Sequence, residues 1–398
     1  LVRKFFKYLV IAILTVIIIG LIVIRPIDNS PYKKGAYYKK TLEQEINITS
    51  SSEILIGWSK VNITPDHPSR LAGYTYRSEY DSVKDSVHVG SIYFSTNEGD
   101  FLFITYDLLL LKADFLDKLE EKIKVDFPNV EGVYYSCSHS HSSFGGWSSG
   151  ILGNVVLGGF DQKIIDHIVE KTSTSVQKAY NNRSLCTFKS QNIDLSQLSM
   201  NRINNNSYTD GDLRTLFFKN EKNETASLTS FSGHPTLIPL KDHYLSGDYP
   251  SIFTKELQEQ LDTDISLFCG GAMGSTSVQN GLKEHQFAKA FGKRIADSVS
   301  QHYAESTYAP LISFSYSSFK VELPETQFKI NQKIRLAPFL SRLLFGHPQP
   351  SISLIRLNKN AMIGFPGEIS GEVFRDIISK APRDFKYFPT SFNGDYIG

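Results

Sequence analysis

Cysteine is scarce in this sequence, with three residues among 398, at scattered positions. An odd and scattered set does not form a disulfide framework, and without a CxxC pair it does not indicate a structural zinc site built on cysteine. Cys137 and Cys269 fall within apolar runs, where a cysteine is typically a small buried hydrophobe.

The sequence also lacks an excess of one charge, because it contains 42 Lys and Arg and 41 Asp and Glu. The first 40 residues hold eight basic residues and one acidic residue, which leaves 34 basic and 40 acidic residues, a net charge of −6, for the remainder. A mildly acidic body lacks the positive surface with which proteins bind nucleic acid, so we exclude nucleic acid as a partner.

What the sequence does have is a long uncharged run at its start, YLVIAILTVIIIGLIVI, from Tyr8 to Ile24. As a helix this run would be about 25 Å long, enough for the hydrocarbon core of a bilayer. It lacks a small-residue cleavage site, which favours an uncleaved single-pass membrane anchor over a signal peptide. The basic residues Arg3, Lys4 and Lys7 before it favour an N-terminus inside and a body outside the cytoplasm.

We therefore expect three parts: an anchor at 1–25, a linker or stalk at 26–52, and a folded body at 53–398. In the body, apolar runs typical of strands alternate with amphipathic helical patterns, which predicts an α/β fold with a mixed sheet in several layers. Strands are expected at 54–64, 101–111, 130–140, 215–219, 226–234, 265–272, 311–323, 352–357 and 361–367. Helices are expected at 115–127, 161–180, 249–261, 285–303 and 371–380.

Polar, glycine-rich clusters follow several of these strands directly, at 138–146, 233–236, 270–277 and 367–368. Ligand sites of open α/β sheets assemble at the carboxyl ends of the strands. We therefore expect the clusters to converge on one site.

The first cluster contains His139 and His141 in an H-x-H pattern. On an extended strand both imidazoles point to the same face, roughly 7 Å apart, which suits two ligands of one metal or one ligand beside a group that handles the substrate. A pair of hydrogen-bonded surface histidines is the alternative.

The other candidates are single residues, each with a structural alternative. His234 ends an apolar strand, and a lone histidine is usually structural. Glu368 follows Gly-Phe-Pro-Gly, where a carboxylate also stabilises a helix start. Asp107 is a possible ligand, orienting group or cap, and Arg202 is either a contact for a substrate oxygen or a solvated cation.

The stretch FCGGAMGSTSV, 268–278, offers hydroxyls and free amide N–H groups that suit an oxyanion. It is neither a Walker loop nor the G-x-S-x-G elbow of esterases. A simple glycine-rich turn is the alternative.

Taken in order, seven motifs resemble those of the neutral/alkaline non-lysosomal ceramidase family. They are IGWSKVNITP (56–65), SHSHSSFGG (138–146), MNRIN (200–204), SGHPT with LSGDYP (232–236 and 245–250), AMGSTSVQN (272–280), PGEISGE (366–372) and NGDYIG (393–398).

The resemblance implies a zinc-dependent amidase that splits the N-acyl amide bond of ceramide or a related lipid-like amide. The implied Zn²⁺ ligands are His139, His234, Glu368 and Tyr396. His141 and Arg202 are implied to contact the substrate or its oxyanion. Ser277 falls on the family's motif serine, which is the nucleophile in one proposed mechanism. In the other mechanism, which we favour, metal-activated water attacks the amide carbonyl.

Three departures from the family are visible. The serine loop reads Gly-Ser-Thr-Ser-Val at 274–278, without the family's aspartate and proline, and Ser-Ser-Phe at 142–144 replaces Ser-Gly-Pro beside the histidines. The family's immunoglobulin-like C-terminal domain is not found in this sequence.

Two other functions stay open on the sequence alone. A non-catalytic, membrane-tethered lipid-binding scaffold fits the altered serine loop. A metallophosphoesterase also gathers His and Asp at strand ends, but Asp107 is followed by two leucines and not by the expected Asp-x-His pattern.

Overall fold

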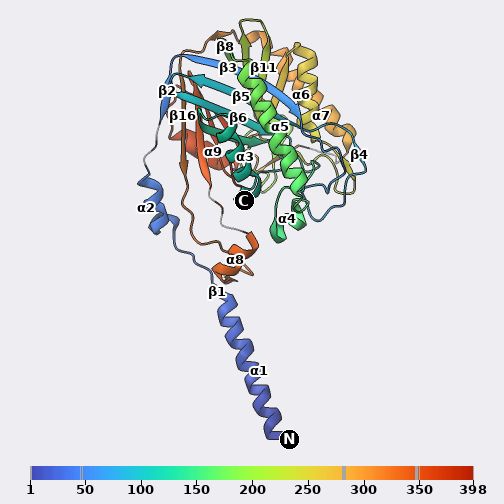
Figure 1. Ribbon diagram of the computed structural model, residues 1–398, viewed down its shortest axis with the longest axis vertical. Helices are drawn as coiled ribbons and strands as arrows, with labels where there is room; N and C mark the ends of the chain where they lie inside the picture. Colours follow the sequence, from blue (N-terminus) through green and yellow to red (C-terminus); the bar gives the residue numbers. More distant parts are fainter. Residues whose placement is uncertain are drawn as a thin grey trace.

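The computed structural model describes residues 2–44, 46, 48–279, 284–345, 348 and 350–397. The last residue of the AMGSTSVQN motif, Asn280, and the ends of the chain, Leu1 and Gly398, lie outside the described residues. A single helix, α1 (Val2–Val23), projects from the body (Figure 1). Its stretch Arg3–Val23 is long and apolar enough to cross a membrane, a property that signal sequences share.

The body contains three larger sheets. The first has the order β3 (Ile54–Asn62), β5 (His88–Thr96), β6 (Gly99–Tyr106), β7 (Val130–Cys137). The second has the order β13 (Ile265–Gly270), β11 (Thr225–Phe231), β10 (Asp212–Asn220), β8 (Cys186–Asp194), β15 (Ala309–Pro310). The third has the order β2 (Thr49–Ser51), β16 (Phe314–Lys320), β18 (Ser351–Leu357), β19 (Asn360–Gly364), β20 (Lys386–Thr390).

Helices and short strand pairs complete the body. The helices are α2 (Ala36–Leu42), α3 (Ala113–Asp126), α4 (Gly150–Val156), α5 (Gln162–Asn181), α6 (Asp248–Leu261), α7 (His285–Gln301), α8 (Pro338–Phe345) and α9 (Gly371–Ser379). The short pairs are β1 (Ile24–Pro26) with β17 (Ile334–Leu336), β4 (Ser82–Val83) with β12 (Tyr244–Leu245), and β9 (Ser199–Asn201) with β14 (Thr276–Val278).

Three clusters of buried side chains hold the sheets and helices together in layers. A central core joins side chains of all three sheets, among them Phe103, Leu216 and Ile355. A second core fills the space between the first sheet and α3 and α5, and a third lies between the second sheet and α6 and α7. The predicted α/β fold with a mixed, multi-layer sheet is confirmed.

The helices expected from the pattern are confirmed to within about two residues, while strands β5, β8 and β20 were not foreseen. β5 is buried on both faces, so it shows no alternation of apolar and polar residues. β8 contains Lys189 and Gln191, which are buried although polar, so its sequence lacks the apolar pattern of a core strand.

The close packing of β3 on α5 depends on Gly57. A Cβ at this position would lie 2.0 Å from the carbonyl oxygen of Ala179 and 2.9 Å from the backbone nitrogen of Arg183. Reciprocal backbone hydrogen bonds between Ile56 and Ser184, at 2.9 and 3.0 Å, hold the two segments at this distance.

We therefore expect Gly57→Ala to lower the free energy of unfolding by about 1–3 kcal/mol, the usual cost of overpacking. Urea unfolding followed by circular dichroism measures this. Leu55→Ala on the same strand is the control, because Leu55 is 39% exposed and its truncation should cost less than about 1 kcal/mol. Equal losses in the two variants would contradict the steric argument.

Candidate metal centre

Each of the three large sheets contains one parallel strand pair: β6 with β7, β11 with β13, and β19 with β20. The candidate residues follow these strands: His139 comes after β7, His234 after β11, the 270–277 cluster after β13, Glu368 after β19 and Tyr396 after β20. Carboxyl ends of parallel strands meet at one edge of a sheet. The expected convergence of the polar clusters is confirmed.

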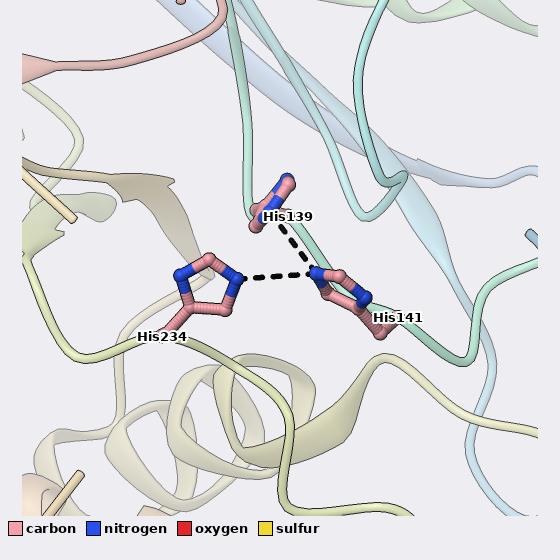
Figure 2. Close-up of side chains that lie close together, drawn as sticks. All are labelled: His139, His141 and His234. Atoms are coloured by element: carbon pink, nitrogen blue, oxygen red, sulfur yellow. Dashed lines mark hydrogen bonds between the residues drawn. The ribbon is translucent and has the colours of Figure 1, made fainter. Parts of the chain in front are cut away.

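Three histidines lie at the centre, with one nitrogen of each directed at a common point (Figure 2). The Nε2 atom of His141 is 3.1 Å from Nε2 of His139 and 3.1 Å from Nε2 of His234. The possible ligand atoms of the three residues all lie within 4.8 Å of one another. His141 therefore lies as close to the centre as the two histidines that the family resemblance assigns as ligands.

The backbone turns sharply at His139. β7 ends at Cys137, so the expected extended strand does not reach the histidines, and His139 has a left-handed φ of 66°. Its Nδ1 lies 2.6 Å from the carbonyl oxygen of Leu109, and its ring stacks on Phe392 at 4.3 Å. Because a carbonyl only accepts, Nδ1 carries the proton, which leaves the lone pair of Nε2 directed at the centre.

Glu368 joins the histidines to the other candidates. Its Oε1 is 3.4 Å from Nε2 of His139, and its Oε2 is 3.8 Å from Nδ1 of His234. The hydroxyl of Tyr396 donates to Oε1 at 2.9 Å, and the guanidinium of Arg202 donates to Oε2 at 3.1 Å. The structure thus brings together six of the seven predicted site residues through direct contacts.

Ser277 is the exception. It lies on β14, and an isolated bridge joins its backbone to that of His234. No side-chain hydrogen bond of Ser277 occurs within the described part of the chain. Its neighbour Ser275 is engaged elsewhere, since its hydroxyl donates to Glu372 at 2.7 Å.

The electrostatic environment keeps the histidines neutral. Burial lowers the pKa of His139, His141 and His234, and the neighbouring histidines and Arg202 lower the pKa of His141 and His234 further. Burial, together with Glu368, raises the pKa of Tyr396.

This donor set fits zinc, which binds neutral imidazole nitrogens and carboxylate oxygens. Nδ1 of His141 is also buried without a hydrogen-bond partner among the described residues, and its Nε2 faces two other ring nitrogens. One imidazole proton does not satisfy all of these contacts, whereas a cation held by His139 and His234 would take up their lone pairs beside His141.

An apolar cavity of about 500 Å³ opens beside the histidines. His139, His141, Glu368 and Tyr396 form its polar end. Its other walls include Leu109, Leu110, Val156, Leu157, Phe328 and Ile397. Tyr74, which the sequence did not single out, also lines it, with its ring 4.9 Å from that of His141.

Asp107, weighed from the sequence, and Asp248, which lies in the LSGDYP motif, have structural roles. Asp107 accepts from the backbone nitrogen of His88 at 3.0 Å and lies 3.5 Å from its Nδ1, away from the histidine cluster. Asp248 begins α6 and accepts from the backbone nitrogens of Leu237 and Ile238, which fixes the turn after His234.

The Ser-Ser-Phe segment at 142–144 departs from the family pattern, but it is buried and does not line the cavity. Residues 140–142 connect the histidine loop to Ser246 through hydrogen bonds. The carbonyl of Ser142 accepts from the backbone nitrogen of Ser246 at 3.0 Å, and the hydroxyl of Ser140 donates to the carbonyl of Ser246 at 2.9 Å.

Asp85 completes this support. It accepts from the hydroxyl of Ser246 and the backbone nitrogen of Gly247, both at 2.6 Å. Burial raises the pKa of Asp85 to about 7, against these two hydrogen bonds, which lower it.

Comparison with known proteins relates this arrangement to one family. The model of neutral/alkaline non-lysosomal ceramidase, N-terminal, matches residues 92–266, which include His139, His141, Arg202 and His234. A search of curated proteins finds no significant match.

Solved structures extend the similarity over most of the chain. Neutral ceramidase from Pseudomonas aeruginosa has a TM-score of 0.71 at 15% identity, covering 86% of this chain and 68% of that chain. A structure described as ceramidase complexed with C2 has a TM-score of 0.67 at 15% identity, covering 86% and 69%. The family resemblance inferred from the sequence motifs is confirmed, and the fold is shared.

The pKa of Asp85 gives a testable pH dependence. Because the folded-state pKa is raised above the ordinary 3.8, the fold binds the proton more tightly than the unfolded chain, and wild-type stability is lost as pH rises from about 4 to about 7. The free energy of unfolding of Asp85→Asn, relative to wild type, should therefore rise over this window by up to about 1.4 kcal/mol per pH unit and then level off. Urea unfolding at a series of pH values measures it.

Ser246→Ala is the companion variant. It removes a hydrogen bond that favours the charged carboxylate, so its own loss of stability should continue to higher pH than in wild type. A difference between Asp85→Asn and wild type that does not change with pH would contradict the raised pKa.

Proposed function

The chain is a member of the neutral/alkaline non-lysosomal ceramidase family, and from this we propose that it hydrolyses the N-acyl amide bond of ceramide or a related lipid-like amide in a zinc-dependent reaction. The observation that carries the proposal is the position of the neutral His139 and His141, with Glu368, at the polar end of an apolar cavity, next to His234. Such a cavity suits a substrate with a hydrocarbon chain and a single amide to be positioned.

His139, His234, Glu368 and Tyr396 would hold the metal, as the family resemblance implies. When bound, zinc supplies a Lewis acid that polarises the amide carbonyl and makes water acidic enough to attack near neutral pH. The remaining residues would act on protons and charge around this centre.

His141 is neutral, and its Nε2 is 3.1 Å from the nearest nitrogens of both histidine ligands. We assign it the role of accepting the proton from the attacking water and passing it to the leaving amine. The guanidinium of Arg202, which is 40% exposed and held by Gly274 and Glu368, would stabilise the oxyanion.

Ser277 is the family's motif serine, but no histidine or carboxylate contacts its hydroxyl within the described residues. A serine nucleophile needs an adjacent base. The geometry therefore supports attack by water over attack by Ser277.

We further propose that α1 anchors the protein in a membrane as a single pass, with both the expected linker segment at 26–52, which pairs with the body through β2, and the catalytic body at 53–398 on the extracytoplasmic side. The apolar length of α1 and the basic residues that precede it support this arrangement. An anchored enzyme would meet its lipid substrate within the same bilayer.

Zinc content and amide hydrolysis test the proposal together. The purified chain should contain one zinc and release fatty acid from a fluorescent N-acyl-sphingosine, and both properties should be lost in His139→Ala and Glu368→Gln, with activity at least about 100-fold lower. Metal analysis and a fluorescence assay measure this. Two metals per chain with phosphatase activity would indicate the metallophosphoesterase instead, and a metal-free, inactive chain would indicate the lipid-binding scaffold.

The roles of His141 and Ser277 can be separated by matched variants. In His141→Ala we expect zinc to be retained while kcat falls by about 10²–10⁴-fold, the usual contribution of a general base. In Ser277→Ala we expect zinc retention and a fall of less than about tenfold. Loss of zinc in His141→Ala would make His141 a ligand, and loss of nearly all activity in Ser277→Ala would make the serine the nucleophile.

A further inference from the structure

The chain stays in contact with the body directly after α1. β1 begins at Ile24, the first residue after the helix, and pairs with β17 in the register Ile24 with Leu336. The backbone nitrogen of Ala337 donates to the carbonyl of Val23, the last residue of α1, at 2.7 Å. The end of the helix is therefore fixed to a segment more than 300 residues away in the sequence.

The same distant segment forms a wall of the cavity. Gln327 exchanges two hydrogen bonds with the backbone of Asp28, at 2.8 and 3.0 Å. Thr326, Gln327 and Phe328 line the apolar cavity together with His139 and His141. The position of the cavity relative to the end of α1 is thus set by a short, hydrogen-bonded connection.

Apolar side chains are exposed on this end of the body. In α8, Phe339 is 56% and Leu343 76% exposed, and Ile330 just before β17 is 47% exposed. In the adjacent α4, Ile151 is 61% and Val155 43% exposed. α8 and α4 lie on the side of the body from which α1 projects (Figure 1). We call these five side chains the apolar face.

Basic residues predominate in the segment that contributes Ile330, Phe339 and Leu343 to the apolar face. Residues 326–345 contain four basic residues, Lys329, Lys333, Arg335 and Arg342, and no acidic residue. Arg342 is paired with Glu325, and Arg335 interacts electrostatically with Asp28, which leaves Lys329 and Lys333 without an acidic partner among the described residues. Apolar side chains bordered by Lys and Arg are typical of segments that lie in the headgroup region of a membrane with anionic lipids.

We propose that the apolar face inserts into the headgroup region of the bilayer that α1 crosses, so that the cavity opens at the membrane and a lipid enters it without passing through water. The apolar face adjoins the end of α1 and is bordered by basic residues. Both features favour a lipid surface over a protein partner. The identity of the lipid as an N-acyl amide rests on the proposed function, whereas the contact with the bilayer rests on the proposed membrane anchor α1 and not on the amidase activity.

Depth-dependent quenching tests the contact directly. The full chain carries a fluorescent label at Leu343→Cys, in a Cys186→Ser background because Cys137 and Cys269 are buried, and is reconstituted in vesicles of zwitterionic and anionic phospholipid with doxyl-labelled chains. The control label is at Ile312→Cys, which is 67% exposed and lies beside β15, outside the apolar face. We expect quenching of at least about twofold at position 343 and none at position 312.

Equal quenching at both positions, or none at position 343, would overturn the proposal. A label at position 343 that is shielded in detergent, with the chain running as a dimer, would also overturn it, because a second copy would then cover the face.

Activity supplies a second test that separates this inference from the proposed function. Phe339→Asp with Leu343→Asp should lower hydrolysis of long-chain ceramide in vesicles by at least about tenfold, and hydrolysis of a short-chain N-acyl-sphingosine in detergent by less than twofold. Leu185→Asp with Ile312→Asp, both exposed positions outside the face, should change neither.

Equal losses of activity on the two substrates would argue against membrane docking. The proposed amidase function would still stand, because wild type would hydrolyse both substrates. If no variant and no wild-type sample hydrolyses any amide, the proposed function fails, and the quenching experiment still decides whether the face meets lipid.

Discussion

The carboxylate of Glu368 connects residues that follow strands of all three large sheets. It follows a strand of the third sheet, and it lies against His139 from the first sheet and His234 from the second. A carboxylate in this position needs positive or hydrogen-bonding partners, and Tyr396 and Arg202 supply them. The chemistry of the site therefore depends on one group that contacts residues positioned by all three sheets.

The parallel strand pairs explain why residues far apart in the sequence lie next to Glu368. Most neighbouring strands in the three sheets are antiparallel, but each sheet contains one parallel pair, and the candidate residues follow those strands. Antiparallel neighbours would have sent successive loops to opposite edges. The fold thus concentrates polar loops on one edge and leaves the opposite edge to turns such as the one between β10 and β11.

The sequence predicted the long helices and the apolar strands well because their periodicity is strong, and it predicted the histidines and Glu368 because each directly follows such a strand. It did not predict β5 and β8, where burial on both faces and buried polar side chains hide the pattern. It also missed Phe392 and the carbonyl of Leu109, which orient His139, since a stacking ring and a backbone oxygen leave no signal in a motif. The closeness of His141 to the centre depends on the left-handed turn at His139, which an extended strand would not contain.

If α1 crosses a bilayer as proposed, the pairing of β1 with β17 has a consequence for the kinetics of substrate capture. With α1 in a bilayer, as proposed, a cavity wall that is hydrogen-bonded to the residues just after this helix would confine the search for substrate to lateral diffusion in one leaflet. The rate of substrate capture would then follow the mole fraction of substrate in that leaflet and would be insensitive to the bulk lipid concentration. Lipids of the opposite leaflet, or of a neighbouring vesicle, would become substrates only after they had been transferred into the enzyme's own surface.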